Sequence, residues 1–207
     1  MRTYPDTLGV ILAGGLARRM GGGDKGLNTI AGRPILAQVA ERLQPQCAGL
    51  ILNANGDPAR FATLGLPVVP DSVPGFAGPL AGVLAGLEWA AEHRPDLAWI
   101  ATIGGDTPFV PGDFVARLHA ARESAGAMLA SASSGGRTHP VNGIWPVALR
   151  EDLRRSLVQE EERKVGRWTS RHGAALAEWS GSPDPFFNVN EPADLEEARR
   201  IAGPEGQ

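Results

Sequence analysis

Glycines and basic residues that suit phosphate chemistry gather near the start of the chain. The segment from Gly14 to Gly26 contains six glycines together with Arg19 and Lys25. A backbone without side chains can wrap a phosphate so that its N–H groups point at the oxygens. Arg19 offers a bidentate fork and Lys25 a compact positive charge. The pattern fits a phosphate-binding loop, and it fits a flexible turn with two solvated cations equally well.

A single carboxylate is the candidate metal ligand. Asp106 follows the apolar segment 97–103 after two glycines and precedes Thr107 and Pro108. Magnesium prefers one or two carboxylates together with substrate phosphates. The alternative is a turn-forming or helix-capping aspartate, because aspartate is common in such positions.

Two further polar residues follow short apolar runs in the same way. Asn53 follows residues 50–52, and Asp71 follows residues 67–70. Both side chains can form hydrogen bonds with a nucleobase or a ribose, and both can equally act as turn formers.

The elements that position these residues alternate between strands and helices. Short apolar runs predict strands at 8–13, 50–52, 67–70 and 97–103, and helical periodicity predicts helices at 34–43, 80–93 and from 113 onward. Such alternation indicates an α/β fold with a mostly parallel sheet and helices on both faces. Ligands bind at the carboxyl ends of parallel strands, so the four polar features should converge on one crevice.

The second half of the chain has a looser pattern. Its expected elements are strands at 127–132, 142–145 and 175–179, a loop at 133–140, a helix at 149–157, a solvated helix face at 160–164 and a final helix. Asn190 is the expected N-cap of that final helix, because asparagine is favoured at this position.

Composition excludes several classes of protein. The 207 residues suit a single domain, and a net charge of −3 gives no basic footprint for nucleic acid. Cys47 is the only cysteine, which excludes an internal disulfide and indicates a reducing compartment, so we expect a cytoplasmic protein. No apolar run approaches the ~20 residues of a membrane span. We further expect a monomer.

Several short motifs together carry a family resemblance. The order Leu12-Ala13-Gly14-Gly15, Arg19, Asp24-Lys25 resembles the signature of nucleotidyltransferases that activate sugars, alditols and pterins. The later motifs narrow the resemblance, and they are Asn53-Ala54-Asn55, Val69-x-Asp71, Gly78-Pro79-Leu80-Ala81-Gly82, Asp106-Thr107-Pro108, His139-Pro140 and Asn188-Val189-Asn190. From about residue 9 to 201 the chain resembles the molybdenum cofactor guanylyltransferase family.

This resemblance implies a three-layer Rossmann-like nucleotidyltransferase fold that occupies residues 1–207 as one domain. It also implies transfer of GMP from GTP to the phosphate of molybdenum-molybdopterin, with Mg²⁺ as cofactor and release of pyrophosphate. Proteins that insert molybdenum and chaperones of molybdoenzymes are the further partners it suggests. The N-terminal half would bind the nucleotide, and the C-terminal half would form the pterin side.

The resemblance also assigns roles to individual residues. The resemblance implies that Leu12, Ala13 and Gly14 contact the guanine nucleotide and that Arg19 and Lys25 contact its phosphates. It also implies that Asn53 and Asp71 bind the nucleoside and that Asp106 holds Mg²⁺ and contacts the nucleotide. Those on the pterin side are Gly78, Gly82, Asn188 and Asn190. Arg19, Lys25 and Asp106 would therefore be the catalytic residues. One departure concerns the paired glycines Gly104 and Gly105 before Asp106, where the family pattern suggests side chains.

Other interpretations stay open at this point. A related nucleotidyltransferase could use CTP on molybdopterin or an NTP on a sugar phosphate, and a regulator or delivery partner could bind an NTP without catalysis. A dinucleotide-binding dehydrogenase is excluded, because the first loop lacks the Gly-x-Gly-x-x-Gly fingerprint. His139 could donate a hydrogen bond to a pterin phosphate or simply face solvent. His93, His119 and His172 are expected at the surface.

Overall fold

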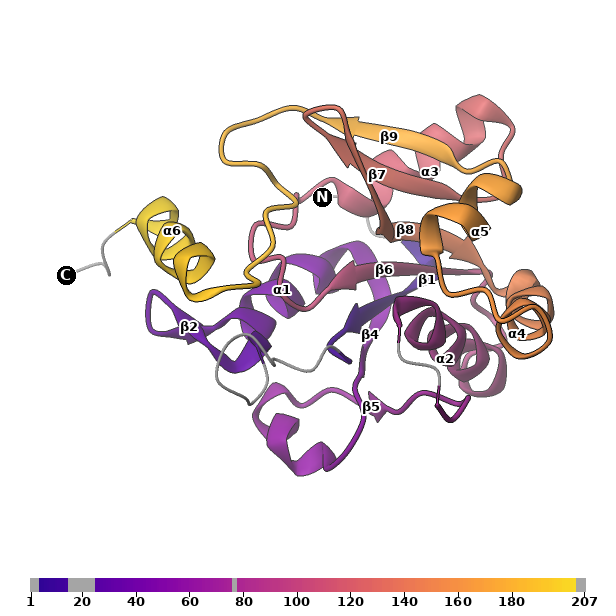
Figure 1. Cartoon of the computed structure of the whole chain (residues 1–207), viewed down its shortest axis with the longest axis horizontal. Helices are drawn as coiled ribbons and strands as arrows, with labels where there is room; N and C mark the ends of the chain where they lie inside the picture. The colour runs from indigo at the N-terminus through magenta and orange to yellow at the C-terminus, as the bar shows by residue number, and fades with distance from the viewer. Residues whose placement is uncertain (1–3, 15–24, 76–77, 204–207) are drawn as a thin grey trace.

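A seven-stranded sheet forms the centre of the computed structural model, which describes residues 4–14, 25–75 and 78–203 (Figure 1). In spatial order its strands are β5 (Val68–Val69), β4 (Cys47–Asn53), β1 (Tyr4–Leu12), β6 (Trp99–Gly104), β8 (Arg137–Pro146), β7 (Ala130–Ser134) and β9 (Ala175–Trp179). Only β8 runs against the common direction of this sheet. The prediction of a mostly parallel α/β sheet is therefore confirmed.

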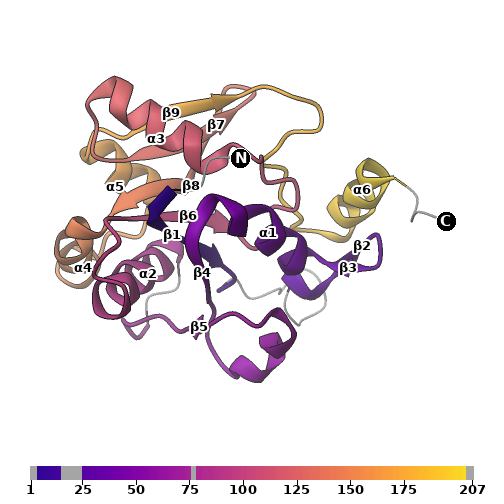
Figure 2. The same ribbon diagram turned by 180° about the vertical axis from the view of Figure 1, so that it is seen from behind.

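Helices cover both faces of the sheet, as right-handed crossovers between parallel strands require. The helices are α1 (Ile35–Leu43), α2 (Pro79–His93), α3 (Phe114–Ala125), α4 (Arg150–Val158), α5 (Val165–Arg171) and α6 (Pro192–Ala202). Side chains of α1 and α3 belong to the core on one face, and those of α2, α4 and α5 to the core on the other. Figures 1 and 2 show these faces from opposite sides. Within the described residues, none of these helices has the length and apolar character needed to traverse a bilayer.

The last helix lies away from the large sheet. α6 contacts the small antiparallel pair of β2 (Thr29–Ile30) and β3 (Arg33–Pro34), as both views show (Figures 1 and 2). The Arg199 Nε donates a hydrogen bond of 3.2 Å to the carbonyl of Thr29 across this contact. This hydrogen bond joins the C-terminal helix α6 to β2, in the N-terminal part of the chain.

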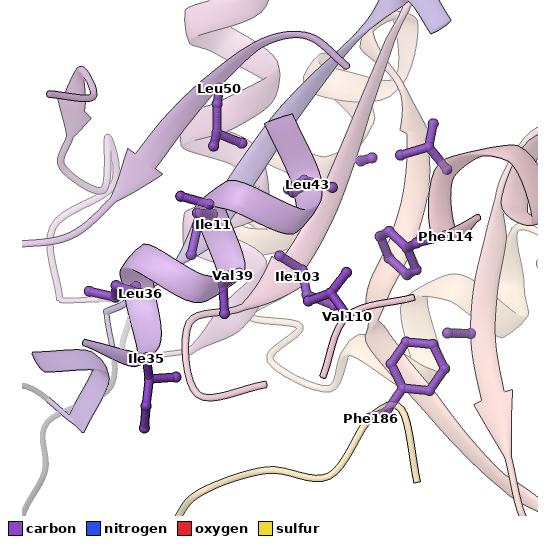
Figure 3. Close-up of a cluster of buried hydrophobic side chains, with 14 of the residues drawn as sticks. Ile11, Ile35, Leu36, Val39, Leu43, Leu50, Ile103, Val110, Phe114 and Phe186 are labelled. Carbon is purple, nitrogen blue, oxygen red and sulfur yellow. The ribbon is translucent and has the colours of Figure 1, made fainter. Parts of the chain in front are cut away.

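The buried core fixes the central strands to the helices. Figure 3 shows Ile11 of β1 and Ile103 of β6 in the same cluster as Val39 and Leu43 of α1. Each fully buried side chain of this size contributes roughly 1.5–3 kcal/mol. The periodicity that predicted α1 is confirmed, since Ile35, Val39 and Leu43 are all fully buried. The core therefore holds in place the strands whose carboxyl ends carry the site residues.

A hairpin replaces the loop that was expected at 133–140. Ser134 at the end of β7 pairs with Arg137 at the start of β8, and the turn between them is Gly135-Gly136. Both glycines have positive φ, 54° and 73°, which a two-residue hairpin turn requires and glycine adopts without a steric cost. The polar residues of this segment gave no apolar alternation, so the strands were not predicted. The hairpin brings His139 beside the cavity described below.

Two further expectations for the second half were wrong. Residues 161–164 form no helix, and a helix resumes only with α5, which the pattern did not predict. Glu191, not Asn190, is the N-cap of α6, because Glu191 and Asp194 form a capping box. Asn190 instead accepts a hydrogen bond from Lys25.

Candidate active site

A cavity of about 970 Å³ lies at the carboxyl ends of β1, β4 and β6. β1 pairs with β4 on one side and β6 on the other, so Leu12, Asn53 and Gly104 are direct neighbours at this edge. Of the predicted site residues, those that line the cavity are Leu12, Ala13, Gly14, Asn53, Asp71, Gly78, Asp106 and Asn188. The volume is near the upper end of the range for ligand pockets, about 300–1,000 Å³. The expected convergence of four strand ends on one crevice is confirmed.

The remaining predicted residues are placed differently. Lys25, Gly82 and Asn190 do not line the cavity, and Arg19 lies outside the described residues. Lys25 begins a short 3-10 helix, Lys25–Leu27, that packs on α1. Gly26 permits this packing, because a Cβ there would lie 2.7 Å from Leu36 Cδ1.

Hydrogen-bonded polar side chains form one wall of the cavity, at the ends of β4 and β5. The Asn53 amide donates to the Val69 carbonyl at 3.1 Å and to Asp71 Oδ1 at 3.0 Å. Asn55 donates to Asp71 Oδ2 at 2.8 Å, and its own Oδ1 accepts from the Asp71 backbone N–H at 2.9 Å. Both carboxylate oxygens of Asp71 are therefore held in place. Such a rigid set of donors and acceptors suits recognition of a polar ring or a ribose.

Gly82 supports this wall from behind. It lies in the first turns of α2, and a Cβ there would lie 2.9 Å from Leu12 Cδ2 and 3.0 Å from Asn53 Cγ. Any larger side chain would therefore displace Asn53 or move the helix. The N-terminus of α2 itself, at Gly78 and Pro79, reaches the cavity.

The loop after β6 is held by the C-terminal segment. The Asp106 carbonyl accepts a hydrogen bond of 2.9 Å from the Val189 N–H, and Thr107 Oγ1 donates to Asn188 Oδ1 at 2.8 Å. Asn142 Oδ1 accepts from the Gly104 N–H at 3.1 Å. Residues distant in the sequence thus fix the direction in which Asp106 leaves the sheet.

The paired glycines before Asp106 have a packing reason. A Cβ on Gly104 would lie 2.8 Å from Asp106 Oδ1, and a Cβ on Gly105 would lie 2.8 Å from Leu36 Cδ2. The Gly105 N–H also donates to the Leu12 carbonyl at 2.9 Å. The departure from the family pattern is therefore compatible with an ordered loop, in which Gly104 leaves room for the carboxylate and Gly105 for Leu36.

Lys25 and Asp106 interact across the site. Burial raises the pKa of Asp106, and the positive charge of Lys25 and the backbone N–H of Asp106 itself partly oppose that rise. The Lys25 Nζ donates a hydrogen bond of 2.9 Å to Asn190 Oδ1. The cation and the carboxylate, 81 positions apart in the chain, are thus on the same side of the molecule.

The donor set indicates what kind of metal could be held here. The described residues contain no group of three or more His, Cys, Asp or Glu side chains that could hold an ion. Within the described chain, no neighbouring side chain donates a hydrogen bond to the Asp106 carboxylate. A divalent cation at Asp106 would therefore complete its shell with phosphate and water oxygens, which is the habit of Mg²⁺.

Some cavity residues were not assigned a role from the sequence. They are Asn55, Arg60, Thr107, Thr138 and Asn142. Asn55 and Thr107 belong to quoted motifs, so their motif positions were a usable signal. Thr138 and Asn142 lie on β8, where Thr138 falls in the segment expected as a loop and Asn142 begins the expected strand 142–145.

The family comparison first defines the class of protein. Residues 9–175 match the model of the MobA-like NTP transferase domain. The fold agrees, with a TM-score of 0.70 to molybdopterin-guanine dinucleotide biosynthesis protein A from Archaeoglobus fulgidus, at 22% identity over 94% of this chain and 98% of that one. The TM-score is also 0.70 to 4-diphosphocytidyl-2C-methyl-D-erythritol synthase from Anaerococcus prevotii, at 11% identity over 95% of each chain. The chain thus has the Rossmann-like α/β nucleotidyltransferase fold.

Curated relatives then define the particular family. A molybdenum cofactor guanylyltransferase from Rhodopseudomonas palustris (strain BisB5) is 58% identical over 98% of this chain and 97% of its own length. One from Bradyrhizobium sp. (strain ORS 278) is 61% identical over 95% of this chain and 93% of its own. The chain belongs to the molybdenum cofactor guanylyltransferase family.

Proposed function

We propose that this chain transfers GMP from GTP to the phosphate of molybdenum-molybdopterin and releases pyrophosphate. The observation that carries the proposal is that the positive charge of Lys25 acts on Asp106 beside a cavity, one wall of which presents Asn53, Asn55 and Asp71. We call this wall the nucleotide wall. The names of the curated relatives support the choice of donor and acceptor.

The chemistry requires control of charge more than proton transfer. A phosphate monoester has a second pKa of about 6, so the acceptor is mostly dianionic at pH 7 and needs no general base. Two anions must still approach each other, and positive charge at the transferred phosphate lowers that barrier. We assign this task to Lys25, whose ammonium group is oriented by Asn190, and to Arg19.

Nucleotidyltransferases of this family use a divalent cation, and we propose that here it is Mg²⁺. Asp106 would hold it together with the nucleotide phosphates. When bound, the cation supplies neutralisation of the phosphate charge. Asp106 suits the role because its carboxylate lines the cavity and its loop is fixed by Asn142 and Val189.

The two halves of the chain receive different substrates in this proposal. The strand ends of β1, β4 and β5 take GTP, and the segment around Asn188 and Asn190 together with Gly78 takes the pterin. Gly82, which the family resemblance places on the pterin side, packs against Leu12 and Asn53 and therefore supports the GTP side. A single domain over residues 1–207, a monomeric state, a cytoplasmic location and delivery to molybdenum-insertion and chaperone proteins stay predictions.

A transfer assay tests the proposed function. The protein is incubated with Mg²⁺, molybdenum-molybdopterin and GTP labelled at the α-phosphate, and the labelled dinucleotide and pyrophosphate are measured. We expect equal amounts of both products and at least tenfold faster transfer from GTP than from CTP. Faster transfer from CTP would show that CTP, and not GTP, is the nucleotide donor. Turnover only with a sugar phosphate would show that molybdenum-molybdopterin is not the acceptor. Nucleotide binding without any product would indicate a regulator instead.

A further inference from the structure

A chain of three hydrogen-bonded side chains lies beside the cavity, opposite the nucleotide wall. His139 of β8 lines the cavity, and its ring Nε2 lies 2.8 Å from Ser134 Oγ at the end of β7. The Ser134 hydroxyl donates in turn to Asp184 Oδ1 at 2.7 Å. Ser134 is buried, and the other two side chains are half-buried. Neither the transfer chemistry nor the family motifs require this connection.

The network determines which ring nitrogen carries the proton. A serine hydroxyl has one hydrogen, and Ser134 donates it to Asp184. Ser134 Oγ can therefore only accept from His139, so the neutral imidazole is protonated at Nε2. The other nitrogen, Nδ1, then carries a lone pair. It has no hydrogen-bond partner among the described residues.

The ring is also held in position by its surroundings. The Phe186 ring lies 5.1 Å from the His139 ring, centroid to centroid. The Phe186 N–H donates to Asp184 Oδ1 at 2.9 Å, which fixes the carboxylate end of the chain of hydrogen bonds. The tight hairpin between β7 and β8 sets the separation of Ser134 and His139. A fixed ring in a fixed tautomer is a preorganised recognition group.

Burial of the His139 ring favours its neutral form. Burial lowers the pKa of His139 below its ordinary value of 6.5. Asp184 and Glu178 of β9 oppose that effect, and Arg137 of β8 adds to it. Glu178 itself accepts a hydrogen bond from Ser133, so its charge is partly engaged elsewhere.

We propose that His139 is a specificity-determining residue for the acceptor, and that its Nδ1 accepts a hydrogen bond from an N–H group of the acceptor's heterocycle. Ser134 and Asp184 are positioning residues that set the tautomer. This inference rests on the proposed function, because it concerns the acceptor of that reaction. It differs from the earlier expectation that His139 donates to a phosphate, since a neutral Nδ1 has no proton to donate.

The tautomer is tested directly on the unmodified protein. Long-range ¹H–¹⁵N spectra of histidine-labelled protein are recorded at pH 7.5, with the His139 signals assigned from their loss in His139→Asn. We expect the Nε2–H tautomer in the wild type and a mixture of tautomers in Ser134→Ala. A wild-type ring protonated at Nδ1, or charged at pH 7.5, overturns the proposal.

Kinetics then test the role in recognition. A neutral hydrogen bond is worth about 1 kcal/mol, or about a fivefold change in affinity. We expect His139→Ala to raise KM for molybdenum-molybdopterin about five- to tenfold, with KM for GTP changed less than twofold. His139→Asn places an amide oxygen near the position of Nδ1 and should restore most of the loss. His93→Ala, at an exposed histidine outside the cavity lining, is the matched control and should change neither KM.

The outcomes separate this inference from the proposed function. An unchanged KM for the acceptor in His139→Ala, or an effect mainly on GTP, overturns the role of His139 while GMP transfer by the wild type still supports the proposed function. If the wild type forms no dinucleotide, the proposed function fails, whereas the tautomer measurement is unaffected. Thermal unfolding of each variant shows that the measured protein is folded.

Discussion

The two ends of the central strands β1 and β6 have contrasting environments. At the carboxyl ends, Leu12 and Gly104 open onto the cavity that contains Asp106. At the amino ends, Thr7 pairs with Trp99, and α3 covers the pair with His119. The same strands thus serve a binding site at one end and a closed polar cluster at the other.

Two histidines make the contrast concrete. His119 uses both ring nitrogens, since Nε2 lies 2.9 Å from Thr7 Oγ1 and Nδ1 lies 2.9 Å from an Arg122 nitrogen. Its ring stacks on Tyr4 at a centroid distance of 4.4 Å. His139, in contrast, uses only Nε2 among the described contacts and lines the cavity. A polar group whose bonds are complete stabilises the fold, and one with capacity left over can bind a ligand.

The largest expected difference between the two ends comes from two aspartates. We expect Asp106→Asn to lower GMP transfer by roughly 1,000-fold or more, because the substrate phosphates lose their metal-holding carboxylate. Burial raises the pKa of Asp106, so the ionised form costs stability at pH 7, and the neutral variant should unfold at the same or a higher temperature. Initial rates at saturating Mg²⁺ and thermal unfolding check both effects.

Asp96→Asn is the matched control for that substitution. Asp96 precedes β6 at the amino end, is exposed and binds Arg94. Its loss should leave transfer unchanged and alter stability only slightly, as for most exposed ion pairs. Near-normal transfer by Asp106→Asn would remove Asp106 from the mechanism and erase the contrast between the two ends.

The chain contains two lysines, and they provide the second test. Lys25→Met should lower kcat about 100-fold, because the phosphates lose a positive charge that Asn190 holds in place. Lys164→Met removes an equal charge at an exposed position between α4 and α5, and it should leave kcat unchanged. Equal losses in both variants would mean that net charge, and not the position of Lys25, matters.

Local patterns predicted the part of the site that lies on parallel strands. Asn53, Asp71 and Asp106 each follow a short apolar run, and the rule that parallel strands end together correctly brought them to one cavity. The periodicity of α1 and α2 was likewise confirmed, because apolar residues at helical spacing must be buried. Where hydrophobic spacing alone determines the geometry, the sequence was sufficient to predict the structure.

The acceptor side could not be predicted in the same way. Its strands at 133–140 are polar, and their pairing depends on a turn of two glycines, not on hydrophobic alternation. The expected surface position of His119 was also wrong, because Tyr4 and Trp99 from distant segments enclose it together with Arg122 of the same helix. Such contacts follow from tertiary packing, which local spacing does not encode.

Substitutions at Gly82 and Gly166 provide the third test, with a smaller expected effect. Gly82→Ala should raise KM for GTP about 10- to 30-fold, because the new Cβ collides with Leu12 and Asn53 on the nucleotide wall. Gly166→Ala in α5 meets only Pro140, at 3.9 Å, so it should preserve KM and gain up to about 1 kcal/mol from helix propensity. Initial rates at varied GTP concentration and thermal unfolding measure the two effects. Unaltered GTP binding in Gly82→Ala would show that the wall tolerates displacement of Asn53.

The smallest effect concerns the closed amino end and depends on pH. Burial, followed by the charge of Arg122, lowers the pKa of His119 from 6.5 to about 4, against the opposing charges of Asp6 and Glu123. Between these two values the unfolded chain binds a proton that the folded chain does not, so folding stability falls as the pH falls from about 6.5 to about 4.

We compare the free energy of unfolding in urea over this pH range with that of His119→Gln, which does not titrate. The wild type should lose on the order of 1 kcal/mol more than the variant, since one pKa unit corresponds to about 1.4 kcal/mol and structural relaxation around the protonated ring reduces the full effect. Parallel pH profiles would show that His119 takes up its proton without strain. The amino end would then be as adaptable as the cavity end, and the contrast between the two histidines would have to rest on ligand binding alone.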